Sequence, residues 1–236
     1  LGSTVVSFED LGSGVKHTDL TINEIYDTPQ VESNHVLWGS EYFFLRDEFQ
    51  SARPQRFQHK VDSVMLTFGG TDQHDLARKV FFAIKSLCDE LEVFVHIVTG
   101  PGYQGYKDLE RVLKAYKSVA LTHDSEVISS IMEQVQLAVT SNGRTVYELA
   151  HMNIPAIVIA QHQRELTHSY ASESNGFVPL GVYQANKTEQ LVYTTLQNLI
   201  NDVYYRRDLF ERMIGSEFNT PKAKVVSKLQ RLLRKQ

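Results

Sequence analysis

The apolar positions of this chain change their spacing along its length, and from residue 61 onward they alternate between strand-like and helix-like patterns. Short continuous runs of Val, Ile and Leu are followed by longer segments whose apolar residues recur every three or four positions. We expect strands at 61–68, 93–98, 119–122, 135–140 and 156–160, and helices at 76–91, 109–116, 127–132 and after residue 143. This alternation predicts an α/β fold: a Rossmann-like parallel sheet with helices on both faces.

The first 60 residues give a less complete pattern. Apolar runs at 4–8, 20–25 and 36–45 predict three strands, and a flexible turn at 12–14 separates the first two. Residues 50–60 are polar, with Pro54 in their middle, which is typical of a linker.

A parallel strand is normally preceded by a helix, and only three residues precede the first run. We therefore interpret residues 1–55 as the truncated remainder of an amino-terminal Rossmann-like domain and its linker, and residues 56–236 as a second, complete Rossmann-like domain. A truncated domain would leave an unpaired sheet edge near Thr4 to Phe8, through which the chain could form a homodimer.

The last third is expected to be helical, with apolar spacing at 188–200, 204–214 and 222–233. Six Lys and Arg residues lie between Lys222 and Lys235. Such a face could bind a membrane or nucleic acid. We favour a solvated helix exterior, since cations near the end of a helix suit its dipole.

Composition narrows the class of protein. The chain has 236 residues, 42% of them hydrophobic and 22% charged, and a net charge of -4, as in ordinary globular domains. No basic excess suggests nucleic acid as the main partner. The one cysteine, Cys88, excludes an internal disulfide and lies in the segment 76–91, where a buried core thiol is expected. We see no membrane span and no leader, so cytoplasm is the expected location.

Two small-residue turns carry the candidate chemistry. Gly69 and Gly70 follow the strand at 61–68, and Ser141, Asn142 and Gly143 follow the strand at 135–140. Both turns fall beyond strand carboxyl ends, where ligands bind in such sheets, and their backbone N–H groups can face a diphosphate. Glu148, about one and a half turns into the next helix, could accept hydrogen bonds from a ribose diol. An ordinary crossover with a polar loop at Gln161, His162 and Gln163 is the alternative interpretation.

Other motifs are weaker. Gly100, Gly102 and Gly105 match the dinucleotide fingerprint, with Asp124 as a distant acid, which leaves a dinucleotide-dependent dehydrogenase as an alternative. That fingerprint should follow the first strand of its unit and open a helix directly, and here it does neither. No Walker A sequence, no H-E-x-x-H and no zinc-finger spacing occur, so we expect no cofactor and no metal.

Two segments of the sequence resemble a known superfamily. FGGTD at 68–72 and SNGRTVYELAHMNIPAIVIAQHQRE at 141–165 are similar to the carboxyl-terminal half of the glycosyltransferase-B fold. The nearest resemblance is to the UDP-sugar hydrolase of pseudaminic acid synthesis and to the spore-coat polysaccharide biosynthesis proteins. VVSFEDLGSG at 5–14 and LWGSEYFFLRDEF at 37–49 extend the similarity over nearly the whole chain.

The resemblance implies a set of site residues. It implies that the base is read by backbone groups of the loop 121–127 and that Glu148 holds the ribose hydroxyls. It places Asp72 and Gln163 toward the sugar. The sequence departs from the family pattern at Arg144, which stands where a smaller residue is usual. The implied nucleotide-binding residues are Gly69, Gly70, Thr71, Ser141, Asn142, Gly143, Thr145 and Glu148.

The family's catalytic histidine, in a G-x-G-H-x-x-R turn, has no counterpart in this sequence, and His17 lies in a different context. The resemblance therefore implies that this chain binds a nucleotide-diphospho sugar, with UDP favoured. It would contribute the nucleotide half of a hydrolase or glycosyltransferase acting in surface polysaccharide or nonulosonic acid biosynthesis. Alone it is expected to be inactive. A non-catalytic sugar-nucleotide-binding module attached to a cytidylyltransferase is a second possibility.

Overall fold

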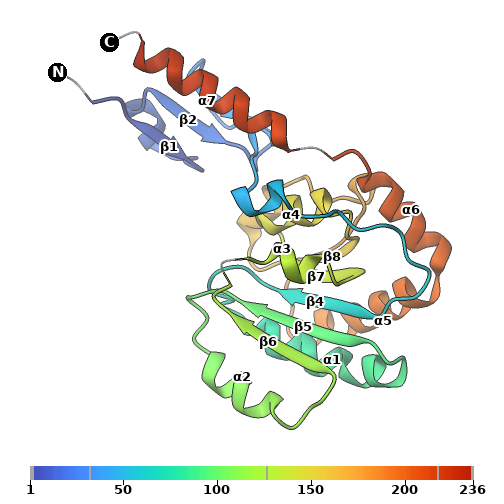
Figure 1. The fold of residues 1–236 in the computed structure, drawn as a ribbon. Coiled ribbons are helices and arrows are strands. Elements are labelled where there is room, and N and C mark those ends of the chain that lie inside the picture. Colours follow the sequence, from blue (N-terminus) through green and yellow to red (C-terminus); the bar gives the residue numbers. More distant parts are fainter. Residues whose placement is uncertain (1–2, 32, 126, 217, 235–236) are drawn as a thin grey trace.

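The computed structural model describes residues 3–31, 33–125, 127–216 and 218–234 and contains two parallel sheets (Figure 1). The larger sheet has the strand order β6-β5-β4-β7-β8-β9, and every neighbouring pair is parallel. Its strands are β4 (Ser63–Thr67), β5 (Phe94–Thr99), β6 (Val119–His123), β7 (Leu137–Ser141), β8 (Ala156–Ala160) and β9 (Phe177–Val182). The predicted α/β class with a parallel sheet is confirmed.

Helices cover both faces of this sheet, as the pattern predicted. On β4, Val64 and Leu66 join one hydrophobic core, whereas Met65 between them joins the other, because successive strand residues point to opposite faces. The first core is closed by α1 (Leu76–Glu90), α2 (Tyr106–Leu113) and α5 (Lys187–Asn201), and the second by α3 (Ser129–Met132) and α4 (Thr145–His151). Cys88 is buried in the first core, as expected.

The smaller sheet comprises β1 (Val6–Phe8), β2 (Leu20–Asn23) and β3 (Val36–Trp38), paired in parallel in that order. A single 3-10 turn, η1 (Ser13–His17), joins β1 to β2. Strand β1 is one of the two edge strands of this sheet. The side chains of Val5, just before β1, and of Phe8, its last residue, are half-exposed. Dimerisation through this edge stays a prediction.

The last helix returns to the smaller sheet. After α6 (Val203–Met213), α7 (Asn219–Leu233) crosses back and lies along β1 and β2 (Figure 1). Val225, Leu229 and Leu232 of α7 pack against Leu20, Ile22 and Leu37. The apolar stripe of α7 therefore completes the core of the small sheet. The domain boundary near residue 55 remains a prediction.

Some sequence expectations differ from the structure in extent. The expected strand at 36–45 ends at Trp38 because Gly39 has a left-handed φ of 93°, and the 3-10 turns η2 (Ser40–Tyr42) and η3 (Asp47–Gln50) follow. The helix expected at 109–116 begins earlier, at Tyr106, and ends at Leu113. Strand β9 and the 3-10 turns η4 (Gln163–Thr167) and η5 (Glu173–Asn175) were not predicted.

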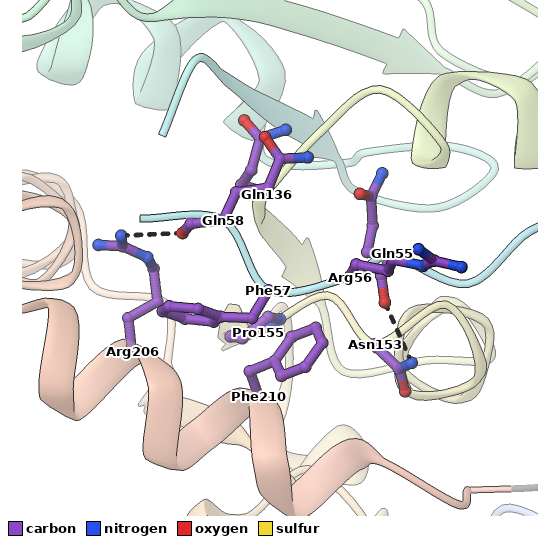
Figure 2. Close-up of a pocket in the computed structure, with 9 residues that line it drawn as sticks. All are labelled: Gln55, Arg56, Phe57, Gln58, Gln136, Asn153, Pro155, Arg206 and Phe210. Atoms are coloured by element: carbon purple, nitrogen blue, oxygen red, sulfur yellow. Dashed lines mark hydrogen bonds between the residues drawn. The ribbon is translucent and has the colours of Figure 1, made fainter. Parts of the chain in front are cut away.

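The segment between the two sheets is irregular but firmly attached (Figure 2). The buried guanidinium of Arg206 on α6 donates to the carbonyls of Gln58 (3.3 Å) and His59 (2.6 Å), and Asn153 donates to the carbonyl of Gln55 (3.3 Å). The cavity between these residues measures only about 10 Å³, which is room for at most a water molecule. These contacts therefore anchor the segment between the two sheets.

None of the helices within the described ranges combines the length and the apolar character that crossing a bilayer requires.

Candidate functional site between two glycine turns

The two predicted turns lie side by side. Strands β4 and β7 are neighbours in the sheet and run in parallel, so the turns that follow them emerge at the same edge. A Cβ placed on Gly69 would come within 3.6 Å of the Ser141 hydroxyl oxygen, which shows how closely the turns approach. The structure therefore brings together the two motifs that the sequence singled out.

Together the turns line one cavity of about 380 Å³. Four consecutive strand ends contribute to it, from β5 and β6 as well as β4 and β7, and α4 closes one side. Of the predicted residues, the cavity wall includes Gly69, Gly70, Ser141, Gly143, Thr145 and Glu148. The volume lies in the range of small-molecule sites.

The glycines of the two turns differ in their backbone conformation. Gly69 has a φ of 76°, a left-handed conformation that side chains rarely adopt. Gly70 and Gly143 lack that constraint, and a Cβ on either would meet no atom within 4 Å. The space beside their Cα atoms is therefore open to a ligand, and the Gly143 N–H itself donates to the Ser141 carbonyl at 2.9 Å.

Helix α4 is short. It has seven residues and no side-chain cap, and Glu148 lies in its first turn. Because so short a helix has a small macrodipole, an anion in the cavity would depend mainly on the backbone N–H groups of the turns.

Glu148 is buried in the cavity wall, with 7% of its surface exposed. Its Oε1 accepts a hydrogen bond from Arg46 Nε at 3.2 Å. Burial raises the pKa of the Glu148 carboxyl above its usual range, and the charge of Arg46 opposes that rise. The carboxylate is thus directed to the cavity and has a protein partner that the sequence did not reveal.

The predicted base-reading loop also reaches the cavity. Strand β6 ends at His123, and Asp124, in a left-handed conformation with a φ of 51°, donates its N–H to the carbonyl of Thr99 at 2.9 Å. Asp124 and Ser125 line the cavity wall. Glu126, in the same loop, lies outside the described residues.

Asp72 has a different contact from the one predicted. Its two carboxylate oxygens accept the backbone N–H groups of Leu76 and Ala77 at the start of α1, both at 2.8 Å. The side chain is buried and occupied in holding that helix terminus, so the geometry gives no support to a position facing the sugar.

Three further predicted residues also lie outside the cavity. The Asn142 amide donates to the carbonyls of Glu165 (2.7 Å) and His168 (3.0 Å), so it fixes the loop after β8. Thr71 lines a separate surface hollow beside Gly102. Gln163 is exposed at the start of η4. Their roles toward a nucleotide stay predictions.

Arg144 joins the two sheets. It donates to Glu9 and to Glu24, and its guanidinium lies 4.7 Å from the centre of the Phe43 ring. Glu24 is fully buried, and burial raises its pKa despite the neighbouring Arg144. The departure from the family pattern at Arg144 thus has a structural reason: its positive charge neutralises acids of the small sheet.

The glycines of the dehydrogenase alternative are used in packing. A Cβ on Gly100 would lie 2.5 Å from Gly70 Cα, and the Gly102 N–H donates to the Gly70 carbonyl at 2.9 Å. These contacts account for Gly100 and Gly102 as supports of the Gly69–Gly70 turn. Among the described residues, no group of three or more His, Cys, Asp or Glu side chains is arranged to hold a metal.

Comparison with known proteins gives two sequence relatives. The chain is 26% identical over 175 residues to the uncharacterised protein MJ1062 of Methanocaldococcus jannaschii. This match covers 67% of this chain and 36% of MJ1062. It is 26% identical over 202 residues to the spore coat polysaccharide biosynthesis protein SpsG of Bacillus subtilis, covering 80% of this chain and 58% of SpsG. The chain thus spans between a third and three fifths of these relatives. No family model matches it.

Solved structures show the same architecture. MurG of Acinetobacter baumannii superposes with a TM-score of 0.60 at 15% identity, covering 98% of this chain and 68% of MurG. An MnaA–UDP structure from S. aureus gives a TM-score of 0.59 at 15% identity, covering 92% of this chain and 60% of MnaA. At these identities the likeness concerns the fold. The chain therefore has the α/β architecture of the glycosyltransferase-B fold, with a six-stranded Rossmann-like sheet of that type.

Proposed function

We propose that the chain binds a nucleotide-diphospho sugar, with the diphosphate in the cavity between the Gly69–Gly70 and Ser141–Gly143 turns. The observation that carries the proposal is the convergence of these turns on one cavity whose wall contains the Glu148 carboxylate. The relative SpsG is named for spore coat polysaccharide biosynthesis, and the similar MnaA structure contains UDP. Both point to sugar nucleotides as the ligand class.

In this arrangement the Gly70 N–H donates to the diphosphate oxygens. Gly143, whose own N–H donates to the Ser141 carbonyl at 2.9 Å, leaves room for the diphosphate, because a Cβ on either glycine would meet no atom within 4 Å. Glu148 accepts from the ribose hydroxyls. The loop at Asp124 and Ser125 faces the base. UDP is the favoured nucleotide by resemblance.

We further propose that a whole protein containing this chain releases the nucleotide from the sugar, by hydrolysis or by transfer to an acceptor, in surface polysaccharide or nonulosonic acid biosynthesis. Among the described residues that line the cavity, none is a histidine able to act as a general base. The chain alone is therefore expected to bind the nucleotide and to turn over little or no sugar nucleotide. The alternative is a binding module without catalysis. It would bind the nucleotide in the same way, but a longer protein that contains this chain would also show no turnover.

Calorimetric titration of the 236-residue chain with UDP, GDP and CMP tests the binding. We expect heat with at least the diphosphates and a preference for UDP, with uridine as the control that lacks phosphate. Undetectable heat with all three nucleotides would contradict the proposal. In a parallel thermal melt, protection by NAD but not by UDP would favour the dehydrogenase alternative instead.

A further inference from the structure

The contact between Arg46 and Glu148 joins two parts of the chain that are 102 residues apart. Arg46 immediately precedes η3, in the segment that leaves the small sheet, and Glu148 lies on α4 of the large sheet. Both residues line the candidate cavity. Arg46 is thus the only described cationic side chain of that cavity, apart from Arg144, and Arg144 is already paired with Glu24.

Arg46 is held from a second side by Glu48. Its Nη1 lies 2.9 Å from Glu48 Oε1, and Glu48 Oε2 in turn accepts the Ser129 N–H at the start of α3, at 2.9 Å. Through Glu48, the guanidinium is tied to α3 as well as to α4. The Arg46 guanidinium therefore has ion-pair partners on both sides, Glu48 and Glu148.

The two side chains differ in exposure. The Glu148 side chain is 10% exposed, whereas the Arg46 side chain is 50% exposed. An ionised carboxylate so deeply buried needs a counter-charge, and Arg46 Nε supplies one to Oε1. Among the described residues, the second oxygen, Oε2, has no donor of its own in the protein, which leaves it to a ligand.

We propose that Arg46 is a positioning residue for ribose recognition: it holds Oε1 of Glu148, so that the ionised carboxylate presents Oε2 to the 2′- and 3′-hydroxyls of a nucleoside diphosphate. This inference rests on the proposed function. It assigns Arg46 a role through Glu148, and not a direct contact with the phosphates. Neither Arg46 nor Glu48 was among the residues that the sequence indicated.

Two ligands separate these roles. UDP carries the ribose diol, whereas 2′,3′-dideoxy-UDP has the same base and diphosphate without it. In the wild-type chain, we expect UDP to bind about tenfold more tightly than the dideoxy compound, because the dideoxy compound cannot donate a hydrogen bond to the charged carboxylate. In Arg46→Met, the affinity for UDP should fall about five- to tenfold, and the affinity for dideoxy-UDP should stay within about twofold.

Variants provide the controls. Arg46→Lys keeps a cation without the planar fork and should recover part of the UDP preference. Arg111→Met removes an exposed arginine of α2 that pairs with Asp108, and it should change neither affinity. Adding Arg46→Met to Glu148→Gln should cause little further loss, because both changes interrupt one interaction. Thermal melts check that each variant is folded. If Arg46→Met does not fold, Arg46→Lys replaces it in the comparison of UDP with dideoxy-UDP.

Each remaining outcome overturns the inference in a distinct way. Equal losses for UDP and dideoxy-UDP in Arg46→Met would mean that Arg46 contacts the diphosphate itself. Unchanged affinities for both would mean that it does not act on the ligand. Equal wild-type affinities for the two compounds would show that Glu148 does not hold the diol. If the wild-type chain binds no UDP at all, the proposed function fails first, and this inference fails with it.

Discussion

Gly100 packs directly on Gly70: a Cβ on Gly100 would lie 2.5 Å from the Gly70 Cα and 2.7 Å from its carbonyl oxygen. Because both contacts are with backbone, no side chain can move aside to make room. The turn after β5 therefore supports the turn after β4, and the shape of the cavity depends on this contact.

Gly100→Ala is expected to destabilise the chain by about 2 kcal/mol and to weaken UDP binding, because the added methyl group displaces the Gly70 turn. Chemical denaturation measures the first effect and calorimetry the second. A fully stable variant with normal UDP affinity would show that the turn has more freedom than its packing indicates.

Gly143→Ala separates binding from stability. Gly143 has no left-handed φ, and its Cβ would meet no protein atom within 4 Å, so the variant should keep the melting temperature of the wild type. If the diphosphate approaches this backbone closely, the methyl group occupies its space, and UDP affinity should fall at least tenfold. Normal UDP affinity in this variant would place the ligand elsewhere.

Glu148→Ala should weaken UDP binding by about 1–2 kcal/mol, because the ribose hydroxyls lose a hydrogen-bond acceptor. Glu211→Ala, on the exposed surface of α6, is the matched control and should bind UDP normally. Calorimetry on the two variants at one pH gives the comparison, and equal affinities would count against a ribose-binding carboxylate.

The elements around the site could be predicted with good accuracy, whereas its side-chain contacts could not. Strand β8 matches its predicted bounds, because a short Val, Ile and Ala run follows Pro155. Strand β9 was not predicted, because Pro179 and Gly181 interrupt its apolar residues and the strand is partly exposed.

The contact of Arg46 with Glu148 spans 102 residues, and no local spacing indicates it. Asp72 did carry a signal. It lies four residues before Leu76, and an aspartate near the start of a predicted helix often accepts that helix's first N–H groups. The resemblance implied a sugar-facing position for Asp72, whereas its carboxylate holds the start of α1.

Glu24 predicts a pH effect on stability. Its folded-state pKa is raised above the ordinary 4.5, first by burial, with Arg144 opposing the rise and Glu9 adding to it. A raised carboxyl pKa contributes stability that is fully present below the unfolded-state value and is lost as pH rises through the folded-state value. Glu24→Gln does not titrate, so its stability relative to wild type should increase between pH 4 and pH 7. A constant difference in unfolding free energy over this range would contradict the assignment.

Cys88 should be chemically inert in the native chain. Burial raises the pKa of its thiol to about 12, so almost no thiolate is present at neutral pH. Iodoacetamide should modify it only after denaturation, as mass spectrometry can show. Rapid labelling of the native chain would mean that the core around α1 opens readily.

A crystal structure of the chain with UDP tests the central claim most directly. We predict the diphosphate against the Gly70 N–H and the open backbone at Gly143, and the ribose hydroxyls within hydrogen-bond distance of the Glu148 carboxylate. UDP bound outside this cavity, for example against the Gly100–Gly105 loop, or a cavity that stays empty at saturating UDP, would contradict the account.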